Sequence, residues 1–376
     1  MVYNRPMIGI LGGAFDPPHK EHIRIAREIA AEFDLEKVVF LPSGNSPHKS
    51  LETPFALRVR MLEAAINEGP FAVDTMEGDF AERAYSYRIL PLLKEKYGEI
   101  AFVFGGDSLL AFDTWKNPRE IAKVCPLIVI PRAEESAEEL LVKAADVKDR
   151  YGADVRLSEK VRGGAVSSSV VRARVSLGMP VPDVKDEVLA VIRESGLYLD
   201  YHEMAERVKS YLPEKRWRHT CGVVLAGLRI NERARLDKNK VIVSCLLHDC
   251  MKYEDRVNEG VPADVVGTKI LHAFNGAEEA RLAFGITDAE ILDAIRYHTT
   301  GRAGMTPLDK LVYTADMVEE ETRDFEGVEE LRAAAYLDLD EGFKRCFLAC
   351  YEQLCESGKP IYHLTIDCYE DLFGGK

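Results

Sequence analysis

The stretch from Ile8 to His22, IGILGGAFDPPHKEH, constrains the fold of the first half of the chain more than any other feature. Its apolar start predicts a buried strand, which the Gly12-Gly13 pair ends in a tight turn. A turn-forming DPP follows, and the apolar spacing beyond His19 is that of a helix. His19 and His22 therefore face the same way on the first helical turn. Free backbone amides, the helix dipole and two imidazole groups at one place predict a polyphosphate site.

The rest of the first half alternates between strands and helices. Short apolar runs predict further strands at 37–41, 100–104, 126–130 and 153–157, and amphipathic spacing predicts helices that include 55–66 and 86–96. This alternation predicts an α/β fold with a doubly wound parallel sheet, whose ligand site lies at the carboxyl ends of the strands. Gly105 and Asp107 follow the 100–104 run at such an end, so we expect them to contact a nucleotide.

Two other segments are candidates for contact with phosphate. His48 and Lys49 lie in a proline-containing loop after 37–41, which suits an anion, with a solvated loop as the alternative. The run from Ser167 to Ser169 opens a helix and Arg172 lies one turn further, which favours a second phosphate cradle over a simple helix cap. Trp115 follows the 100–104 strand on a loop, where an indole can stack on a flat ring or belong to the core.

These segments together resemble the nicotinate-nucleotide adenylyltransferases of the nucleotidyltransferase superfamily. The resemblance covers about residues 5–198 and rests on GGAFDPPHKEH, SPHK, GGD with Trp115 beyond it, and SSSVVR. The family's motif has Gly where this chain has Glu21, and Ser replaces its Thr in SSSVVR. The resemblance implies that the phosphate of nicotinate mononucleotide attacks the α-phosphorus of ATP, with Mg²⁺ bridging the phosphates, and releases pyrophosphate.

The resemblance also implies roles for particular residues. His19 and His22 would be catalytic, holding the ATP phosphates and the developing charge. The nicotinate ring would stack on Trp115 in a pocket shaped by Tyr85 and Ser86. The residues expected to bind ATP are Gly12, Gly13, Phe15, His48, Lys49, Gly105, Asp107, Ser168, Ser169 and Arg172.

The chain has 376 residues, which is long for one core, so two domains are expected. The strand pattern ends near Tyr198, and we place the domains at 1–198 and 199–376. Beyond that point the spacing is helical, which predicts an all-α domain with helical segments at 202–212, 218–234, 240–250, 277–284, 288–298, 307–320 and 328–357.

Histidines and aspartates indicate the chemistry of the second half. Four histidines lie on four separate helical segments, and His248-Asp249 and Asp316 lie in apolar ones. Burying so many polar groups is costly unless they share a function, so a metal site is expected, and its N and O ligands suit Fe, Mn, Zn or Mg. The expected ligands are His219, His248, Asp249, His272, His298 and Asp316.

This half resembles HD-domain phosphohydrolases, and more narrowly the small HD family that splits diadenosine tetraphosphate symmetrically into two ADP. The resemblance spans about 203–365 and rests on LLHDCMK, LHAFNGA and YHTTGRAGMTPLDKLVYTADMVEEETR. It implies one or two divalent metals, iron being favoured over manganese or another ion, with Asp249 bridging the pair. Asp249 and Lys252 would act in catalysis, and Lys252, Arg302 and Arg323 would hold the polyphosphate.

Composition limits the partners. A net charge of −14 argues against nucleic acid and anionic membranes. The sequence contains no membrane-spanning run and no signal-peptide pattern, so we expect a cytoplasmic protein in which the eight cysteines are reduced thiols. Homo-oligomerisation is left open.

The leading hypothesis is a bifunctional enzyme of NAD biosynthesis and dinucleoside polyphosphate hydrolysis. One alternative keeps both folds but changes the substrates to nicotinamide mononucleotide and another nucleotide. A second alternative makes the α domain a nucleotide-sensing regulator without turnover, and the complete set of six ligand candidates argues against it.

Overall fold

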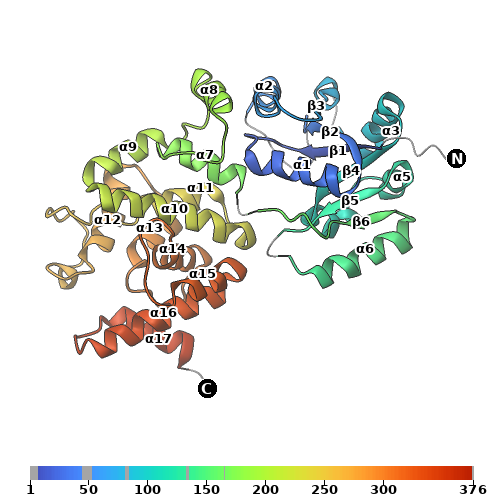
Figure 1. Ribbon diagram of the computed structural model, residues 1–376. Coiled ribbons are helices and arrows are strands. Elements are labelled where there is room, and N and C mark those ends of the chain that lie inside the picture. Colours follow the sequence, from blue (N-terminus) through green and yellow to red (C-terminus); the bar gives the residue numbers. More distant parts are fainter. Residues whose placement is uncertain (1–6, 45–52, 81–83, 133–134, 165, 375–376) are drawn as a thin grey trace. The chain divides into compact units, whose positions relative to one another are not determined.

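A computed structural model describes residues 7–44, 53–80, 84–132, 135–164 and 166–374. The chain divides into two compact units (Figure 1). Unit 1 contains residues 1–172 and 181–197, and unit 2 contains residues 173–180 and 198–376. The segment 173–180 thus packs with the second unit, where Ala173 and Leu177 join its apolar core. The limits 1–198 and 199–376 remain our proposal for the two domains.

Unit 1 is built on a six-stranded parallel sheet with the strand order β3-β2-β1-β4-β5-β6 (Figure 1). The sequence-based expectation of a doubly wound parallel α/β fold is confirmed. The strands are β1 (Met7–Gly13), β2 (Leu35–Pro42), β3 (Phe71–Val73), β4 (Ile100–Gly105), β5 (Leu127–Ile130) and β6 (Val155–Leu157). The three-residue β3 was not predicted, because it is too short to carry a strand pattern.

The strand order reverses between β1 and β4. Leu11 of β1 is paired with Val103 of β4 in parallel register, so Gly13 and Gly105, each two residues further on, end their strands at the same edge. In open α/β sheets a ligand binds in the crevice outside the strand ends where the order reverses. The glycine turns of both motifs therefore meet at the place where this fold binds ligands.

Helices connect the strands of unit 1, and the residues that face the sheet are apolar. Ile23, Ala26 and Ile29 form the buried face of the first helix, at the spacing expected of an amphipathic helix. The helices are α1 (Lys20–Glu32), α2 (Phe55–Ala65), α3 (Ser86–Tyr97), α4 (Gly106–Leu110), α5 (Pro118–Val124), α6 (Ala137–Tyr151) and α8 (Asp186–Glu194), with short 3-10 turns η1 (Met76–Asp79) and η2 (Phe112–Thr114). Helix α7 (Ser168–Ser176) begins in unit 1, and its residues from 173 onward belong to unit 2.

Unit 2 is helical throughout its described part, as the sequence predicted. Its helices are α9 (His202–Tyr211), α10 (Glu214–Ala234), α11 (Lys238–Leu247), α12 (Leu271–Ala283), α13 (Ala289–Tyr297), α14 (Pro307–Val318), α15 (Val328–Leu337), α16 (Leu339–Glu356) and α17 (His363–Phe373), with a 3-10 turn η3 (Ala263–Val265). The segment 328–357, which carries helical spacing, forms two helices, because Asp338 leaves the helical conformation and caps α16 by accepting from Glu341 N–H.

Helices α10, α11, α13 and α14 pack against one another and contribute most of the apolar core of this unit. All eight cysteines are free thiols, as expected. Over the described part of the chain, every helix is either too short or too polar to cross a membrane.

Candidate functional site

The first candidate site begins where β1 ends. Gly12 and Gly13 close the strand, Phe15 takes a left-handed backbone conformation (φ 49°), and α1 starts at Lys20 with His19 as its N-cap. The imidazole rings of His19 and His22 lie against each other at a tilt of 32°, with centroids 3.7 Å apart. The structure therefore brings the two predicted histidines together at a helix N-terminus, where anions are favoured.

The hydrogen bonds of these histidines define what they offer to a ligand. Nδ1 of His22 accepts from the backbone N–H of His19 at 3.1 Å, so the neutral ring carries its proton on Nε2 and can donate there. Burial lowers the pKa of His19 to about 4 and lowers that of His22 well below its ordinary value. Nδ1 of His19 is buried and has no hydrogen-bond partner among the described residues. Both imidazole rings are thus neutral near pH 7. A ligand could supply the hydrogen-bond partner that Nδ1 of His19 lacks among the described residues.

The serine-arginine segment lies against the same turn. The Ser168 hydroxyl donates to the carbonyl of Pro17 at 3.0 Å, and the Arg172 guanidinium donates to the carbonyl of Asp16. A second Arg172 nitrogen donates to the Ser169 hydroxyl at 3.3 Å. The segment predicted as a second phosphate cradle is therefore joined directly to the DPP turn.

Glu21, which replaces the glycine of the family motif, points its carboxylate at Arg24 and at the backbone N–H of Gly164. The N–H of Gly164 reaches Oε1 at 2.8 Å. The hydrogen bond from Arg24 is the largest effect on this carboxyl and holds its pKa below the ordinary value. The extra negative charge is thus neutralised within the protein.

Asp107 and Trp115 lie beyond the end of β4. Asp107 lies in the first turn of α4, where it accepts from Ser108 N–H at 2.9 Å, and it pairs with Arg132 at 3.4 Å. The half-buried Trp115 ring packs against the rings of the 100–112 segment, at centroid distances of 5.5 Å from Phe104 and 5.4 Å from Phe112. Trp115 thus belongs to the edge of the core and still keeps part of its surface accessible.

The predicted pyridine pocket is only partly described. The Tyr85 ring contacts Lys116, the residue after Trp115, whose ammonium lies 4.8 Å from the ring centroid. Ser86 begins α3. His48 and Lys49 lie outside the described residues.

Sequence reasoning missed Arg58, which is buried under this turn. Its guanidinium donates to the carbonyls of Ala14 at 2.8 Å, Ser43 at 2.7 Å and Thr53 at 3.2 Å. Arg58 thus joins the ends of β1 and β2. In the sequence it looked like one more polar residue of an amphipathic helix, and no pattern distinguished it.

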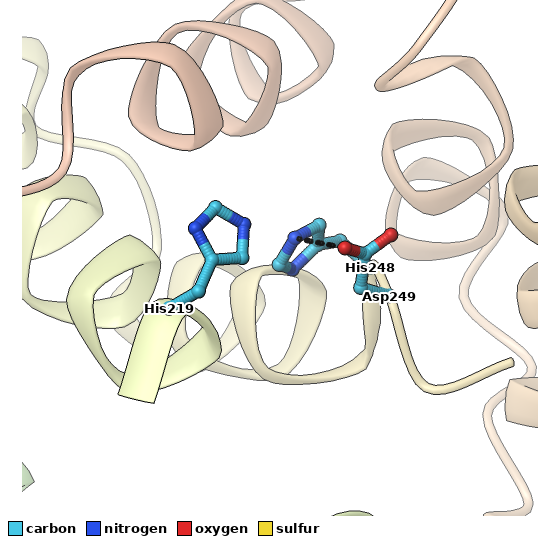
Figure 2. A group of neighbouring side chains, drawn as sticks. All are labelled: His219, His248 and Asp249. Atoms are coloured by element: carbon cyan, nitrogen blue, oxygen red, sulfur yellow. Dashed lines mark ion pairs between the residues drawn. The ribbon is translucent and has the colours of Figure 1, made fainter. Parts of the chain in front are cut away.

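The second candidate site is a cluster in unit 2 that we call the six-residue cluster: His219, His248, Asp249, His272, His298 and Asp316. Helix α10 carries His219, α12 carries His272 and α14 carries Asp316, while His248 with Asp249 and His298 immediately follow α11 and α13. Their nitrogen and carboxylate oxygen atoms form three overlapping groups, each within 4.8 Å. Figure 2 shows the His219 ring facing His248, with Asp249 beside it.

The nitrogen and oxygen atoms of the cluster lie close enough together to bind an ion in common. Oδ1 of Asp249 lies 3.2 Å from Nε2 of His272 and 3.5 Å from Nε2 of His298, and its Oδ2 lies 3.6 Å from Nε2 of His248. At the other end Oδ1 of Asp316 lies 2.9 Å from Nε2 of His219. All six predicted ligand residues are thus brought together.

The outer nitrogen of every histidine in the cluster is occupied. Nδ1 donates to the carbonyl of the residue three positions earlier in three cases: His248 to Cys245 at 2.7 Å, His272 to Lys269 at 2.9 Å, and His298 to Ile295 at 2.7 Å. In His219 the partner of Nδ1 is the buried carboxylate of Glu319, at 3.1 Å. A carbonyl or carboxylate can only accept, so each Nδ1 carries a proton and each Nε2 faces inward.

The charges of the cluster test whether it fits a cation. Inward-facing Nε2 atoms and carboxylate oxygens are all acceptors in the neutral-imidazole state, and His248 Nε2 and Asp249 Oδ1 are buried without a hydrogen-bond partner among the described residues. Burial lowers the pKa of His248 to about 3, and the surrounding histidines hold the pKa of Asp249 well below its ordinary value despite burial. This set of inward-facing nitrogen and oxygen acceptors fits a divalent metal.

Cations surround the cluster. Arg216 donates to Oδ2 of Asp249 at 2.9 Å, Arg323 donates to Oδ1 of Asp316 at 2.6 Å, and Lys252 donates to Nε2 of His272 at 2.9 Å. Lys252 and Arg323 were predicted to lie here, whereas Arg216 was not. Its position three residues before His219, one turn away on α10, is the signal that could have revealed it.

Arg302, the remaining predicted polyphosphate contact, forms different contacts. It donates to the fully buried carboxylate of Asp309 at 2.8 Å and pairs with Asp293 at 3.2 Å. Its guanidinium also lies over the Tyr297 ring, 4.6 Å from the centroid. These contacts join α13 to α14, and the polyphosphate contact of Arg302 stays a prediction.

Comparison with protein families and known proteins finds matches to both halves of the chain. The Cytidylyltransferase-like family matches residues 10–174, and the HD domain family matches residues 216–321. A protein named probable nicotinate-nucleotide adenylyltransferase, from Clostridium botulinum, is 34% identical over 50% of this chain and 97% of its own length.

Two further comparisons concern the second half. The symmetrical bis(5'-nucleosyl)-tetraphosphatase of Bacillus subtilis is 34% identical over 45% of this chain and 95% of its own length. A crystal structure of a predicted HD superfamily hydrolase involved in NAD metabolism, from Clostridium acetobutylicum, is 30% identical over 47% of this chain and 98% of that one, with a TM-score of 0.43.

Proposed function

We infer two reactions for this chain from the families of its two halves. The first half belongs to the nicotinate-nucleotide adenylyltransferase family, and the second half belongs to the symmetrical bis(5'-nucleosyl)-tetraphosphatase family. Relatives of both halves are enzymes, and each half carries its own candidate site. We propose that unit 1 makes the dinucleotide of nicotinate and adenine from ATP and nicotinate mononucleotide, and that unit 2 hydrolyses a dinucleoside polyphosphate.

The first reaction forms one phosphorus–oxygen bond and breaks another. A phosphate oxygen of nicotinate mononucleotide bonds to the α-phosphorus of ATP, and the α–β bridge breaks to release pyrophosphate. No side chain has to act as a nucleophile, so catalysis rests on positioning and on stabilising the developing charge. Mg²⁺, when bound, neutralises charge on the ATP phosphates.

The observation that carries this proposal is the joining of two donor segments at one turn. His22 offers a proton on Nε2 at the N-terminus of α1, and Ser168 and Arg172 are held against the same turn through Pro17 and Asp16. These groups would bind the triphosphate, the two histidines at the reacting phosphate and Arg172 towards the β/γ end. Trp115 with Tyr85 and Ser86 would receive the pyridine ring.

Product analysis tests this half. The protein is incubated with ATP and Mg²⁺ plus either nicotinate or nicotinamide mononucleotide, and pyrophosphate and the dinucleotide are measured. We expect faster turnover of nicotinate mononucleotide. Faster turnover of the amide would change the substrate and keep the reaction, whereas no turnover of either would refute the proposal.

The second reaction cleaves a phosphoanhydride with water. In diadenosine tetraphosphate, a water oxygen bonds to one of the two central phosphorus atoms, the bridge between the second and third phosphates breaks, and two ADP form as the water loses its proton. One or two divalent metals, with iron as the first choice and manganese as the second, would supply charge neutralisation and activation of the attacking water. His219, His248, Asp249 and Asp316 would hold one metal, and Asp249 would share the second with His272 and His298.

The inward Nε2 atoms of all four histidines carry this proposal, because each Nδ1 is occupied from outside and each Nε2 is left to bind a metal. The cationic side chains beside the cluster would then contact the substrate. Arg216, Lys252 and Arg323 pair with the cluster and are placed to hold a polyphosphate once metals take over the carboxylates and imidazoles.

Metal-dependent product analysis tests the second half. Diadenosine tetraphosphate is incubated with protein stripped of metal and then resupplied with Fe²⁺ or Mn²⁺. We expect two ADP per substrate and no AMP or ATP. Saturable binding of the nucleotide without any cleavage, under both metals, would favour a sensor in place of a hydrolase.

A further inference from the structure

Glu319 is a buried acid that immediately follows α14, and its side chain lies beside the six-residue cluster without belonging to it. The residue is 0% exposed. Its carboxylate accepts from Nδ1 of His219 at 3.1 Å, from the backbone N–H of Glu321 at 2.6 Å, and from both the N–H and the hydroxyl of Thr322. These donors surround the buried side chain and fix the position of its oxygen atoms.

His219 differs from the other three histidines in this partner. Those three donate Nδ1–H to a backbone carbonyl of their own helical turn. A carboxylate is a stronger, charged acceptor, which fixes the tautomer more firmly and makes the opposite nitrogen a better electron-pair donor. The acid reaches His219 from a different part of the chain, 100 residues away.

We propose that Glu319 is a positioning residue for the metal centre. Glu319 holds His219 with Nε2 directed inward, and it thereby raises the affinity of the six-residue cluster for a divalent cation. This inference rests on the proposed function, since it assigns Glu319 a role towards the metal that the six-residue cluster would bind. Glu319 itself would not touch the metal or the substrate.

Neighbouring residues hold Glu319 in place. A Cβ added at Gly222, one turn after His219 on α10, would lie 2.1 Å from Oε2 of Glu319, so only glycine leaves room for the acid here. The Arg332 guanidinium donates to the carbonyls of Glu319 at 2.8 Å and Val318 at 2.7 Å. Backbone and side chain are therefore both held in the position that meets His219.

The test is metal affinity, measured on the full chain with Co²⁺ as a visible probe in competition with a chelator. We compare wild type with Glu319→Gln, Gly222→Ala and the control Glu320→Gln. The control changes the neighbouring acid, which is half-exposed and pairs with Arg229 and Tyr336. We expect Glu319→Gln to weaken Co²⁺ binding about 10- to 100-fold and to shift the Co²⁺ absorption bands. Gly222→Ala should act in the same direction by displacing the carboxylate, and Glu320→Gln should match wild type.

The outcomes separate this inference from the proposed function. A Glu319→Gln protein with wild-type affinity and wild-type Co²⁺ bands overturns the role of Glu319 and leaves the metal site standing. Wild type that binds no divalent metal overturns the proposed function itself. A lowered unfolding temperature with unchanged Co²⁺ bands would show a purely structural role, and if Glu319→Gln does not fold, Gly222→Ala decides between these results.

Discussion

Nε2 of His272 lies 3.2 Å from Oδ1 of Asp249. Both atoms are acceptors, because His272 carries its proton on Nδ1, which donates to the carbonyl of Lys269. The Lys252 ammonium balances this contact, at 2.9 Å from Nε2 of His272 and 3.7 Å from Oδ1 of Asp249. The Lys252 ammonium is thus the cation that lies beside these two candidate metal ligands.

Lys252→Met should therefore separate metal binding from turnover. Removing the ammonium takes away a competitor for Nε2 of His272, so we expect equal or tighter Mn²⁺ binding, by up to about tenfold. Hydrolysis of diadenosine tetraphosphate should fall by about 100-fold, because the polyphosphate loses a cation. The exposed Lys269→Met is the control, and Mn²⁺ binding that is weaker in Lys252→Met would contradict this reading.

His22→Ala should abolish one activity and spare the other. The substitution removes the Nε2–H donor at the start of α1, so adenylyl transfer should fall about 100- to 1,000-fold. Hydrolysis by unit 2 should stay within about twofold of wild type, since its cluster is built only from residues of that unit. Both rates are measured on the same preparation, with the exposed His363→Ala as control. An equal loss of both activities would mean that the two sites depend on one another.

Glu21→Gly tests whether the departure from the family motif impairs transfer. The carboxylate is already bound by Arg24 and the N–H of Gly164, so its removal should change the transfer rate by less than about threefold. The unfolding free energy of unit 1 should fall by about 1 kcal/mol, because glycine is a poor helix residue. Glu28→Gly, on the same helix and paired with the same arginine, is the matched control. A tenfold rise in rate for Glu21→Gly alone would show that Glu21 hinders catalysis.

Glu77 should make unit 1 sensitive to pH. Burial raises its pKa from 4.5 to about 7, although Gly44 N–H and Arg58 act in the opposite direction. Below pH 4.5 the side chain is protonated in both the folded and the unfolded chain. As the pH rises towards 7 only the unfolded chain ionises freely, so the stability of the fold is progressively lost, by at most about 3 kcal/mol.

Glu77→Gln removes this titration and keeps an acceptor for Gly44 N–H. The difference in unfolding free energy between Glu77→Gln and wild type should grow as the pH rises from about 4.5 to 7 and then stay constant. Trp115 fluorescence in a Trp217→Phe background reports on unit 1, and the exposed Glu63→Gln is the control. A difference that does not vary with pH would contradict the shifted pKa.

Sequence patterns were sufficient for the layout of both units. The strands that carry the glycine turns are long apolar runs, and the ligand candidates His248, Asp249 and Asp316 are polar residues in apolar segments, so each is visible locally. The split of 328–357 at Asp338 was hidden because helical spacing continues through the break.

The hydrogen bonds that orient the site could not be predicted. Arg58 contacts three carbonyls in the connections that follow β1 and β2, and Glu319 reaches His219 from 100 residues away. Neither contact leaves a periodic pattern in the sequence, because it depends on how distant segments pack. The direction of each Nδ1–H likewise depends on ring orientation, which only the folded structure defines.

Metal counting on Asp249→Asn tests the central claim most directly, namely that the six-residue cluster is a divalent-metal site. Asp249 is the one carboxylate that belongs to two of the three ligand groups, so losing its charge should weaken both sites. Mn²⁺ titration of metal-free protein should give two ions per chain for wild type and for the exposed Asp340→Asn control, with binding by Asp249→Asn at least about 100-fold weaker. Wild-type binding by Asp249→Asn, or no binding by the wild type, would contradict the account.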